Sequence, residues 1–238
     1  MQAFFSSLSS QFYISFVDQN RWQSYLKGLG VSFLVTAGAL AIGIVIGILV
    51  AICRTAHDQK KGKVNPVLSV FNRICIIYTT VIRGTPMMVQ LLIMGFVVFV
   101  SSRNLIGIAI LTLGINSGAY VSEIIRSGIM SIDPGQMEAG RSLGLPYSTV
   151  MNKIIIPQAI KNVFPALGNE LITLFKDTSL VTVIGLTDLT KAAMQIQART
   201  YQAFMPYLCI AGLYLLCVMI MTKILGTVEG RMRKSERR

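Results

Sequence analysis

Long apolar stretches alternate with short polar connections along this chain. Crossing the roughly 30 Å hydrocarbon layer of a bilayer takes about 20 predominantly apolar residues of helix. We therefore predict five membrane-spanning helices, over residues 29–52, 70–100, 105–126, 160–186 and 204–225. The second stretch is too long for one straight span, and we expect a break at residues 83–86, Arg-Gly-Thr-Pro, because proline removes a helix donor. The pattern predicts an all-α membrane protein.

Residues 127–159 are too polar to span a bilayer, and charge predicts the side on which they lie. The chain is 53% hydrophobic and 13% charged, with 22 Lys and Arg against 10 Asp and Glu, a net charge of +12. In a soluble protein this excess would suggest nucleic acid, but between spans basic residues set membrane orientation. Fifteen of them fall on one side of the five spans and five on the other, with Arg83 and Lys176 inside spans. We predict an outer N-terminus, a cytoplasmic C-terminus and a cytoplasmic 127–159 loop, and no nucleic-acid partner.

The two ends of the chain differ from the spanning part, residues 28–226. Residues 1–27 mix aromatic side chains such as Trp22 and Tyr25 with polar ones, which favours an interfacial segment on the outer face. A disordered leader is the alternative. Residues 227–238 form a basic tail, expected in the cytoplasm near anionic lipid headgroups.

Three motifs carry a resemblance to a known family. The order Glu138-Ala139-Gly140, then Gly144, then Ile154-Ile155-Ile156-Pro157 resembles the cytoplasmic signature of binding-protein-dependent ABC importer permeases. The signature spacing is kept, while Gly140 replaces an Ala and Ile156 a Leu of the family pattern. Residues 83–86 followed by Gln90-Leu91, and residues 176–180, Lys-Asp-Thr-Ser-Leu, are similar to the polar amino acid branch, the histidine, glutamine and arginine permeases. The resemblance covers residues 25–225.

The resemblance implies the type I ABC importer permease fold in a bacterial inner membrane. In such permeases the signature loop forms a short coupling helix in a groove of an ATPase subunit. Two permeases, identical or homologous, pair with two ATPases, and an extracellular binding protein delivers the substrate, here a polar amino acid. The residues that this resemblance assigns to ATPase coupling are Glu138, Ala139, Gly140, Arg141, Gly144 and Pro157.

The chemistry of the loop agrees with a short helix. Asp133-Pro134-Gly135 is a helix-opening turn, residues 137–143 are good helix formers, and Gly144 and Pro146 would end the helix. We expect Gly140 and Gly144 to lie on one face that lets a partner backbone approach, and Arg141 to pair with an acidic group. The alternative is an amphipathic segment that lies on the bilayer surface.

Ionisable and polar side chains inside the predicted spans are candidates for a translocation path, because they are costly in lipid unless they face water or a partner. A zwitterionic amino acid needs groups of both signs along such a path. The candidates are Arg83, Thr85, Gln90, Asn116, Tyr120, Glu123, Glu170, Thr173, Lys176 and Asp177. The alternative is that Lys176–Asp177 and Arg83–Glu123 are structural ion pairs.

No G-x-x-x-x-G-K-[ST] phosphate loop, nucleophile elbow or metal-binding His pair occurs in the sequence. We therefore expect a transport subunit and not an enzyme, with no cofactor and no bound metal, and ATP hydrolysis in a separate subunit. The rival interpretations are a secondary transporter, which usually shows internal repeats, and a channel-type subunit that works without an ATPase.

Overall fold

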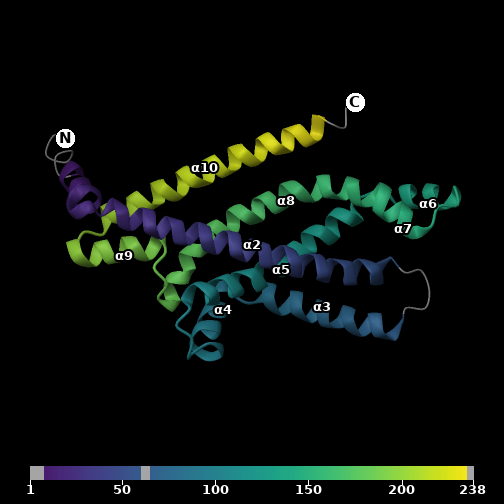
Figure 1. Cartoon of the computed structure of the whole chain (residues 1–238), viewed down its shortest axis with the longest axis horizontal. Helices are drawn as coiled ribbons and strands as arrows, with labels where there is room; N and C mark the ends of the chain where they lie inside the picture. Colours follow the sequence, from purple (N-terminus) through teal and green to yellow (C-terminus); the bar gives the residue numbers. More distant parts are fainter. Residues whose placement is uncertain (1–7, 60–64, 235–238) are drawn as a thin grey trace. The chain divides into compact units, whose positions relative to one another are not determined.

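The computed structural model describes residues 8–59 and 65–234, and within these ranges it consists of helices and connecting turns without strands (Figure 1). The main helices are α2 (Trp22–Asp58), α3 (Pro66–Gly84), α4 (Met87–Ile93), α5 (Leu105–Met130), α6 (Pro134–Ser142), α7 (Tyr147–Val150), α8 (Ile156–Asp177), α9 (Leu189–Thr200) and α10 (Phe204–Lys234). Wider π-helical turns occur at Tyr13–Val17, Met94–Val98 and Met151–Ile155, and tighter 3₁₀ turns at Asp18–Asn20 and Thr178–Ile184.

Four of the described helices, α2, α3, α5 and α10, are long and apolar enough to cross a membrane. They coincide with four of the five predicted spans, α3 with the first part of the second. The predicted span over 160–186 differs, because α8 ends at Asp177 and the chain continues as a 3₁₀ turn to Ile184. The polar side chains of Asn169, Glu170 and Lys176 in α8 lower its hydropathy. The count of five spans and the orientation of the termini stay predictions.

The second predicted span is interrupted at the expected position. α3 ends at Gly84, Thr85 has an extended backbone with φ −116° and ψ 142°, and α4 begins at Met87 after Pro86. The Thr85 hydroxyl donates a hydrogen bond of 2.9 Å to the carbonyl of Val81, which the missing helix turn would otherwise leave without a donor. The break therefore follows from Pro86, and Thr85 satisfies part of the freed backbone.

The chain folds into two compact units, each built from separate stretches of sequence. Unit 1 comprises Met1–Ala39, Met87–Thr112 and Ile172–Thr222, and unit 2 comprises Leu40–Pro86, Leu113–Leu171 and Lys223–Arg238. The helices α2, α5, α8 and α10 each contribute one part to each unit. Unit 2 contains α3, α6 and α7, and unit 1 contains α4 and α9.

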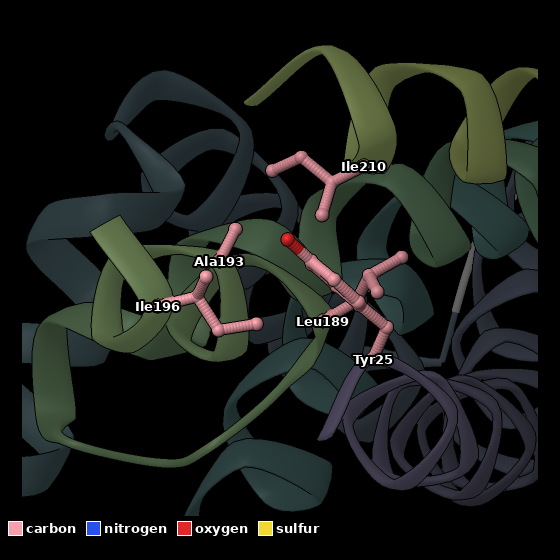
Figure 2. Packing of buried hydrophobic residues seen from close by; sticks show 5 residues of the cluster. All are labelled: Tyr25, Leu189, Ala193, Ile196 and Ile210. Atoms are coloured by element: carbon pink, nitrogen blue, oxygen red, sulfur yellow. The ribbon is translucent and has the colours of Figure 1, made fainter. Parts of the chain in front are cut away.

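The core of unit 1 surrounds the first turns of α2. Tyr25 is 1% exposed and packs with four buried apolar residues of α9 and α10 (Figure 2), which are Leu189, Ala193, Ile196 and Ile210. Its hydroxyl donates to the carbonyl of Ser15 at 3.4 Å. The predicted division at residue 27 does not appear as a break in the helix, because α2 begins at Trp22 and continues without interruption. Tyr25 therefore belongs to a packed core, which the composition of residues 1–27 did not indicate.

The N-terminus of α9 is fixed by a buried carboxylate. The two carboxylate oxygens of Asp188 accept hydrogen bonds from the backbone N–H groups of Thr190 at 3.0 Å and Lys191 at 2.9 Å. Burial raises the pKa of Asp188, and the two N–H donors act in the opposite direction because they favour the ionised form. Asp188 is thus an N-cap that positions α9 against α2 in unit 1.

Replacing this cap tests how unit 1 is stabilised. We expect Asp188→Ala to lower the free energy of unfolding by about 0.5–2 kcal/mol, because it leaves two N–H groups of α9 without an acceptor. Asp188→Asn keeps one of the two side-chain acceptors and should lose less stability than Asp188→Ala. Thermal unfolding in detergent measures both, and hydrogen exchange at Thr190 and Lys191 reports the local effect. Equal stability and exchange in all three proteins would contradict the capping role.

Candidate functional site

The signature segment of the loop forms a capped helix, α6, as the sequence predicted. Asp133 is its N-cap, and a side-chain oxygen of Asp133 accepts a hydrogen bond of 2.8 Å from the N–H of Gly135. Pro134 occupies the first helical position, where its missing N–H breaks no helix bond and its fixed φ suits the helix. A helix of nine residues has little stability of its own, so its caps and its packing decide whether it forms.

The C-terminus of α6 requires glycine at position 144. The backbone of Gly144 has φ +81°, a left-handed conformation that residues with a Cβ adopt at a cost. The N–H of Gly144 donates to the carbonyl of Arg141 at 3.0 Å, and the N–H of Leu145 donates to that of Gly140 at 3.2 Å. This pair of bonds is a Schellman motif, which reverses the chain direction and satisfies two terminal carbonyls.

Gly140 has a different role from the predicted one. It is buried, and a Cβ on it would lie 2.6 Å from a methyl carbon of Val150 in α7. The prediction that Gly140 and Gly144 together open one face to a partner backbone is therefore wrong for Gly140, because the same chain fills that face. Gly140 instead lets α6 and α7 approach each other.

The solvent-facing side of α6 consists of other signature residues. Glu138, Ala139 and Arg141 are exposed, and Leu143, just after the helix, is 82% exposed. Leu143 is thus an exposed apolar side chain beside exposed charges at the end of α6. Pro157 is also exposed, after the π-helical turn Met151–Ile155 that joins α7 to α8.

A side-chain contact connects this helical loop to the end of α2. The hydroxyl of Tyr147 in α7 donates a hydrogen bond to the side-chain oxygen of Gln59. Burial raises the pKa of Tyr147, because it disfavours the charged phenolate. A groove of about 610 Å³ lies beside this contact and is lined by residues that include Asp58, Met137, Glu138 and Arg141.

Three of the predicted path residues of unit 2 meet in one charged cluster. The carboxylate of Glu123 in α5 forms an ion pair with Arg54 and a second one with Arg126 at 3.3 Å, and Arg83 lies 4.0 Å away. The guanidinium of Arg83 also lies over the ring of Tyr120, 5.2 Å from the ring centre. The structure therefore contains the Arg83–Glu123 pair. Its distance of 4.0 Å is the longest of the three contacts that the Glu123 carboxylate makes with arginine side chains. Because Arg83 is half-exposed, the cluster borders on open space.

A second polar contact connects α5 and α8 in unit 2. The hydroxyl of Ser117 donates a hydrogen bond of 2.8 Å to the carboxylate of Glu170. Asn116, a predicted path residue, is adjacent to Ser117 in α5, and the hydroxyl of Tyr78 in α3 donates to the carbonyl of Ile115 at 2.6 Å. Glu170 is thus held in unit 2 by a serine that sequence reasoning did not select.

The remaining predicted path residues lie in unit 1, apart from Thr85, which is exposed at the end of α3. Gln90 in α4 is 8% exposed, whereas Thr173 and Lys176 in α8 are exposed and Asp177 is half-buried at the end of α8. The salt bridges of the described residues do not include a Lys176–Asp177 pair. Whether these two residues line a path or stabilise the helix stays a prediction.

The profile of one transport family matches most of this chain, residues 43–234. The chain belongs to the binding-protein-dependent transport system inner membrane component family. The arginine transport system permease protein ArtQ of Bacillus subtilis is 40% identical over 219 residues, which are 89% of this chain and 93% of that protein. The glutamine transport system permease protein GlnP of Escherichia coli K12 is 33% identical, over 87% of this chain and 92% of that protein.

Solved structures show the same fold. An amino acid ABC transporter crystallised with histidines has a TM-score of 0.79 and 39% identity, and the match covers 88% of this chain and 94% of that one. The MetNI methionine ABC transporter in an inward-facing conformation has a TM-score of 0.75 at 19% identity, which supports the fold alone. The chain is therefore an ABC permease of the membrane, and the predicted family is confirmed.

Within this family fold, the residues that sequence reasoning missed are mostly partners of those that it selected. Arg54 was counted as a cytoplasmic charge, but it contacts Glu123. Ser117 holds Glu170, and Val150 covers Gly140. Arg54 and Ser117 come from helices distant in sequence from their partners, and Val150 comes from the helix that follows α6, so no pattern within one helix indicates these pairings.

The charged cluster leads to a prediction about stability. We expect Glu123→Gln to lower the free energy of unfolding by about 1–3 kcal/mol, because the largely buried Arg54 loses its ionised partner. Asp58→Asn is the matched control, since Asp58 is half-exposed, pairs with Arg126 at 3.2 Å and should contribute less than about 1 kcal/mol. Thermal and denaturant unfolding in detergent compare the two variants. An equal loss in both would mean that the cluster does not centre on Glu123.

Proposed function

We propose that this chain is the membrane-spanning permease subunit of an ATP-driven importer for polar amino acids in a bacterial cell membrane. It forms the translocation path with a second permease, receives substrate from an extracellular binding protein and is coupled to two ATPase subunits through α6. The capped signature helix, with its exposed Glu138, Arg141 and Leu143, is the observation that carries this proposal. The relatives named for arginine and glutamine transport support a polar amino acid as the substrate.

The contacts of α6 suggest how movement of a partner would reach the helices of unit 2. Gly140 of α6 packs tightly on Val150, so α6 cannot slide freely over α7. The π-helical turn Met151–Ile155 joins α7 to α8 without a break in the helical backbone. A displacement of α6 by a nucleotide-hydrolysing subunit is therefore transmitted to α8, which carries Glu170. The Tyr147–Gln59 hydrogen bond couples the same movement to the end of α2.

The polar residues of the two units supply the two charge signs that a zwitterionic substrate needs. In unit 2, Arg83 can attract a carboxylate, while Glu123 and Glu170 can attract an ammonium group. Arg83 is half-exposed, so a substrate can reach it without disrupting the fold. In unit 1, Lys176 and Asp177 repeat this combination at the end of α8. We propose that the ten path candidates line the route, with these five as its charged groups.

Coupling through α6 is tested at Gly144. We expect Gly144→Val to reduce ATP-dependent uptake by at least about tenfold, because a β-branched residue at φ +81° costs about 1–2 kcal/mol and distorts the end of α6. Gly144→Asn should keep most of the uptake, since Asn tolerates the left-handed conformation. The measurement is uptake into proteoliposomes that contain the permease with its co-purified ATPase.

The substitution Leu143→Asp changes the surface at the end of α6 but not its backbone, so it tests the surface separately from the shape of the helix. This side chain is exposed, so the fold and the thermal stability should not change, whereas co-elution of the ATPase subunit and uptake should both fall. The Ser148→Asp change, at an exposed position of α7, is the control and should leave both intact. Normal assembly and uptake in Leu143→Asp and Gly144→Val would refute coupling through α6. Active transport by the chain alone would favour a secondary transporter or a channel.

The translocation path is tested by neutral substitutions at two carboxylates. We expect Glu170→Gln and Asp177→Asn each to raise the KM for uptake about tenfold, because a charge-assisted hydrogen bond contributes about 1.5–3 kcal/mol. Basal ATPase activity of the complex and its assembly should be unchanged, and they serve as controls. Uptake with parental KM and rate in both variants would remove these residues from the path.

A further inference from the structure

Two cysteines of the chain come together in unit 2, and the mechanism proposed above uses neither. Cys53 lies in the last turns of α2 and Cys75 in the middle of α3, and both side chains are partly exposed. Their thiols share a hydrogen bond. The two sulfur atoms are therefore neighbours in the folded chain, although they belong to different helices.

The packing of α2 and α3 against α5 holds the two thiols in place. A Cβ on Gly118 of α5 would lie 2.8 Å from a methyl carbon of Ile46 in α2 and 2.9 Å from the hydroxyl of Tyr78 in α3, so the three helices meet at this level. From there α3 runs back alongside α2 (Figure 1). Cys53 lies about two turns after Ile46 and Cys75 about one turn before Tyr78, so both lie on the same side of this contact.

Both thiols lie near the predicted cytoplasmic boundary of the bilayer. The first predicted span ends just before Cys53, and the second begins at residue 70, about 8 Å before Cys75 along the helix. A water-soluble reagent can reach partly exposed side chains at this depth. The other two cysteines, Cys209 and Cys217, lie about 12 Å apart along α10 in unit 1, whereas a disulfide joins residues whose Cα atoms are about 4.4–6.8 Å apart.

We propose that Cys53 and Cys75 form a reversible disulfide that links α2 to α3, by exchange with a small-molecule disulfide such as glutathione disulfide. The thiolate of one cysteine attacks the S–S bond of glutathione disulfide, forms a mixed disulfide and releases one glutathione thiolate. The thiolate of the second cysteine attacks the protein sulfur of the mixed disulfide and releases the second glutathione. Two cysteine thiols are thereby oxidised, and glutathione disulfide is reduced to two glutathione thiols, which take up the two protons.

The folded chain favours the second step of this exchange. The partner thiol is already in hydrogen-bond contact, so the attack is intramolecular and needs only a small movement of the side chains. A fold that favours the disulfide is in turn stabilised by it, because the two equilibria form one thermodynamic cycle. The bond lies beside Arg54, whose ion pair with Glu123 joins α2 to α5. Oxidation thus adds a covalent link between α2 and α3 at the same level of unit 2.

Treatment with glutathione disulfide tests the proposal on the permease purified in detergent with the subunits that co-elute with it. Trypsin cleaves after Arg54, Arg73 and Arg83, so Cys53 and Cys75 fall in separate peptides, residues 28–54 and 74–83. We expect mass spectrometry, after alkylation of the free thiols, to find these two peptides joined, and dithiothreitol to separate them. The joined fraction should exceed the fraction of chains with a glutathionyl group on Cys53 or Cys75 by at least about tenfold, because the second step is intramolecular.

Cys53→Ser and Cys75→Ser are the test variants, and Cys209→Ser is the matched control. With one thiol of the pair removed, the other should stop at the mixed disulfide with glutathione, whereas Cys209→Ser should form the joined peptides to the parental extent. We also expect the oxidised parent to unfold at a higher temperature than the reduced one, and this shift to be absent from Cys53→Ser.

Two results would overturn the proposal. One is that Cys53 and Cys75 stay unlinked after treatment, whether free or glutathionylated. The other is that the linked chain unfolds at the same temperature as the reduced chain or at a lower one, since the fold would then not favour the bond. Neither measurement depends on transport, so the outcome is separate from that of the proposed function.

Discussion

The close approach of α2 and α5 in unit 2 is the constraint on which the polar architecture of that unit depends. Lipid is as apolar as leucine, so helices in a bilayer associate through van der Waals contact, and small residues allow that contact. A Cβ on Gly43 would lie 2.9 Å from the Cβ of Ser117, and a Cβ on Gly47 would collide with Val121. Gly43 and Gly47 therefore form the α2 side of a close helix contact, which we call the seam. Only residues without a side chain at these two positions allow α2 and α5 to approach so closely.

The charged cluster lies further along the same seam. Arg54 follows Gly47 on α2, and Glu123 follows Val121 on α5, so the close helix packing brings their side chains together. Ser117, which packs against Gly43, is also the residue that donates to Glu170 of α8. Ser117 thus takes part both in the close packing of the helices and in the hydrogen bond to Glu170. A bulkier residue at position 43 would therefore disturb the environment of Glu170 without contacting it.

Sequence alone gave good predictions wherever the signal was local. The apolar stretches predicted α2, α3, α5 and α10, Pro86 predicted the break, and Asp133 with Gly144 predicted the bounds of α6. The candidate site was predicted less completely, because its contacts join helices that are distant in sequence. The loss of helical regularity after Asp177 was also missed, since residues 178–184 are apolar enough to continue a span, whereas in the structure they form a 3₁₀ turn with Thr178, Val181 and Ile184 buried.

The case of Gly140 shows why a motif and its structure have to be considered together. The motif alone suggested two glycines open to a partner, but only Gly144 has open space around it, and Gly140 is covered by Val150. This difference changes the physical account of coupling. A helix that docked through two bare glycines would be held by its partner, whereas α6 is already fixed to α7 and through it to α8. In the proposed coupling, a partner would therefore contact only the exposed side of α6 around Leu143, and the continuous helical backbone from α7 to α8 would convey its displacement toward Glu170.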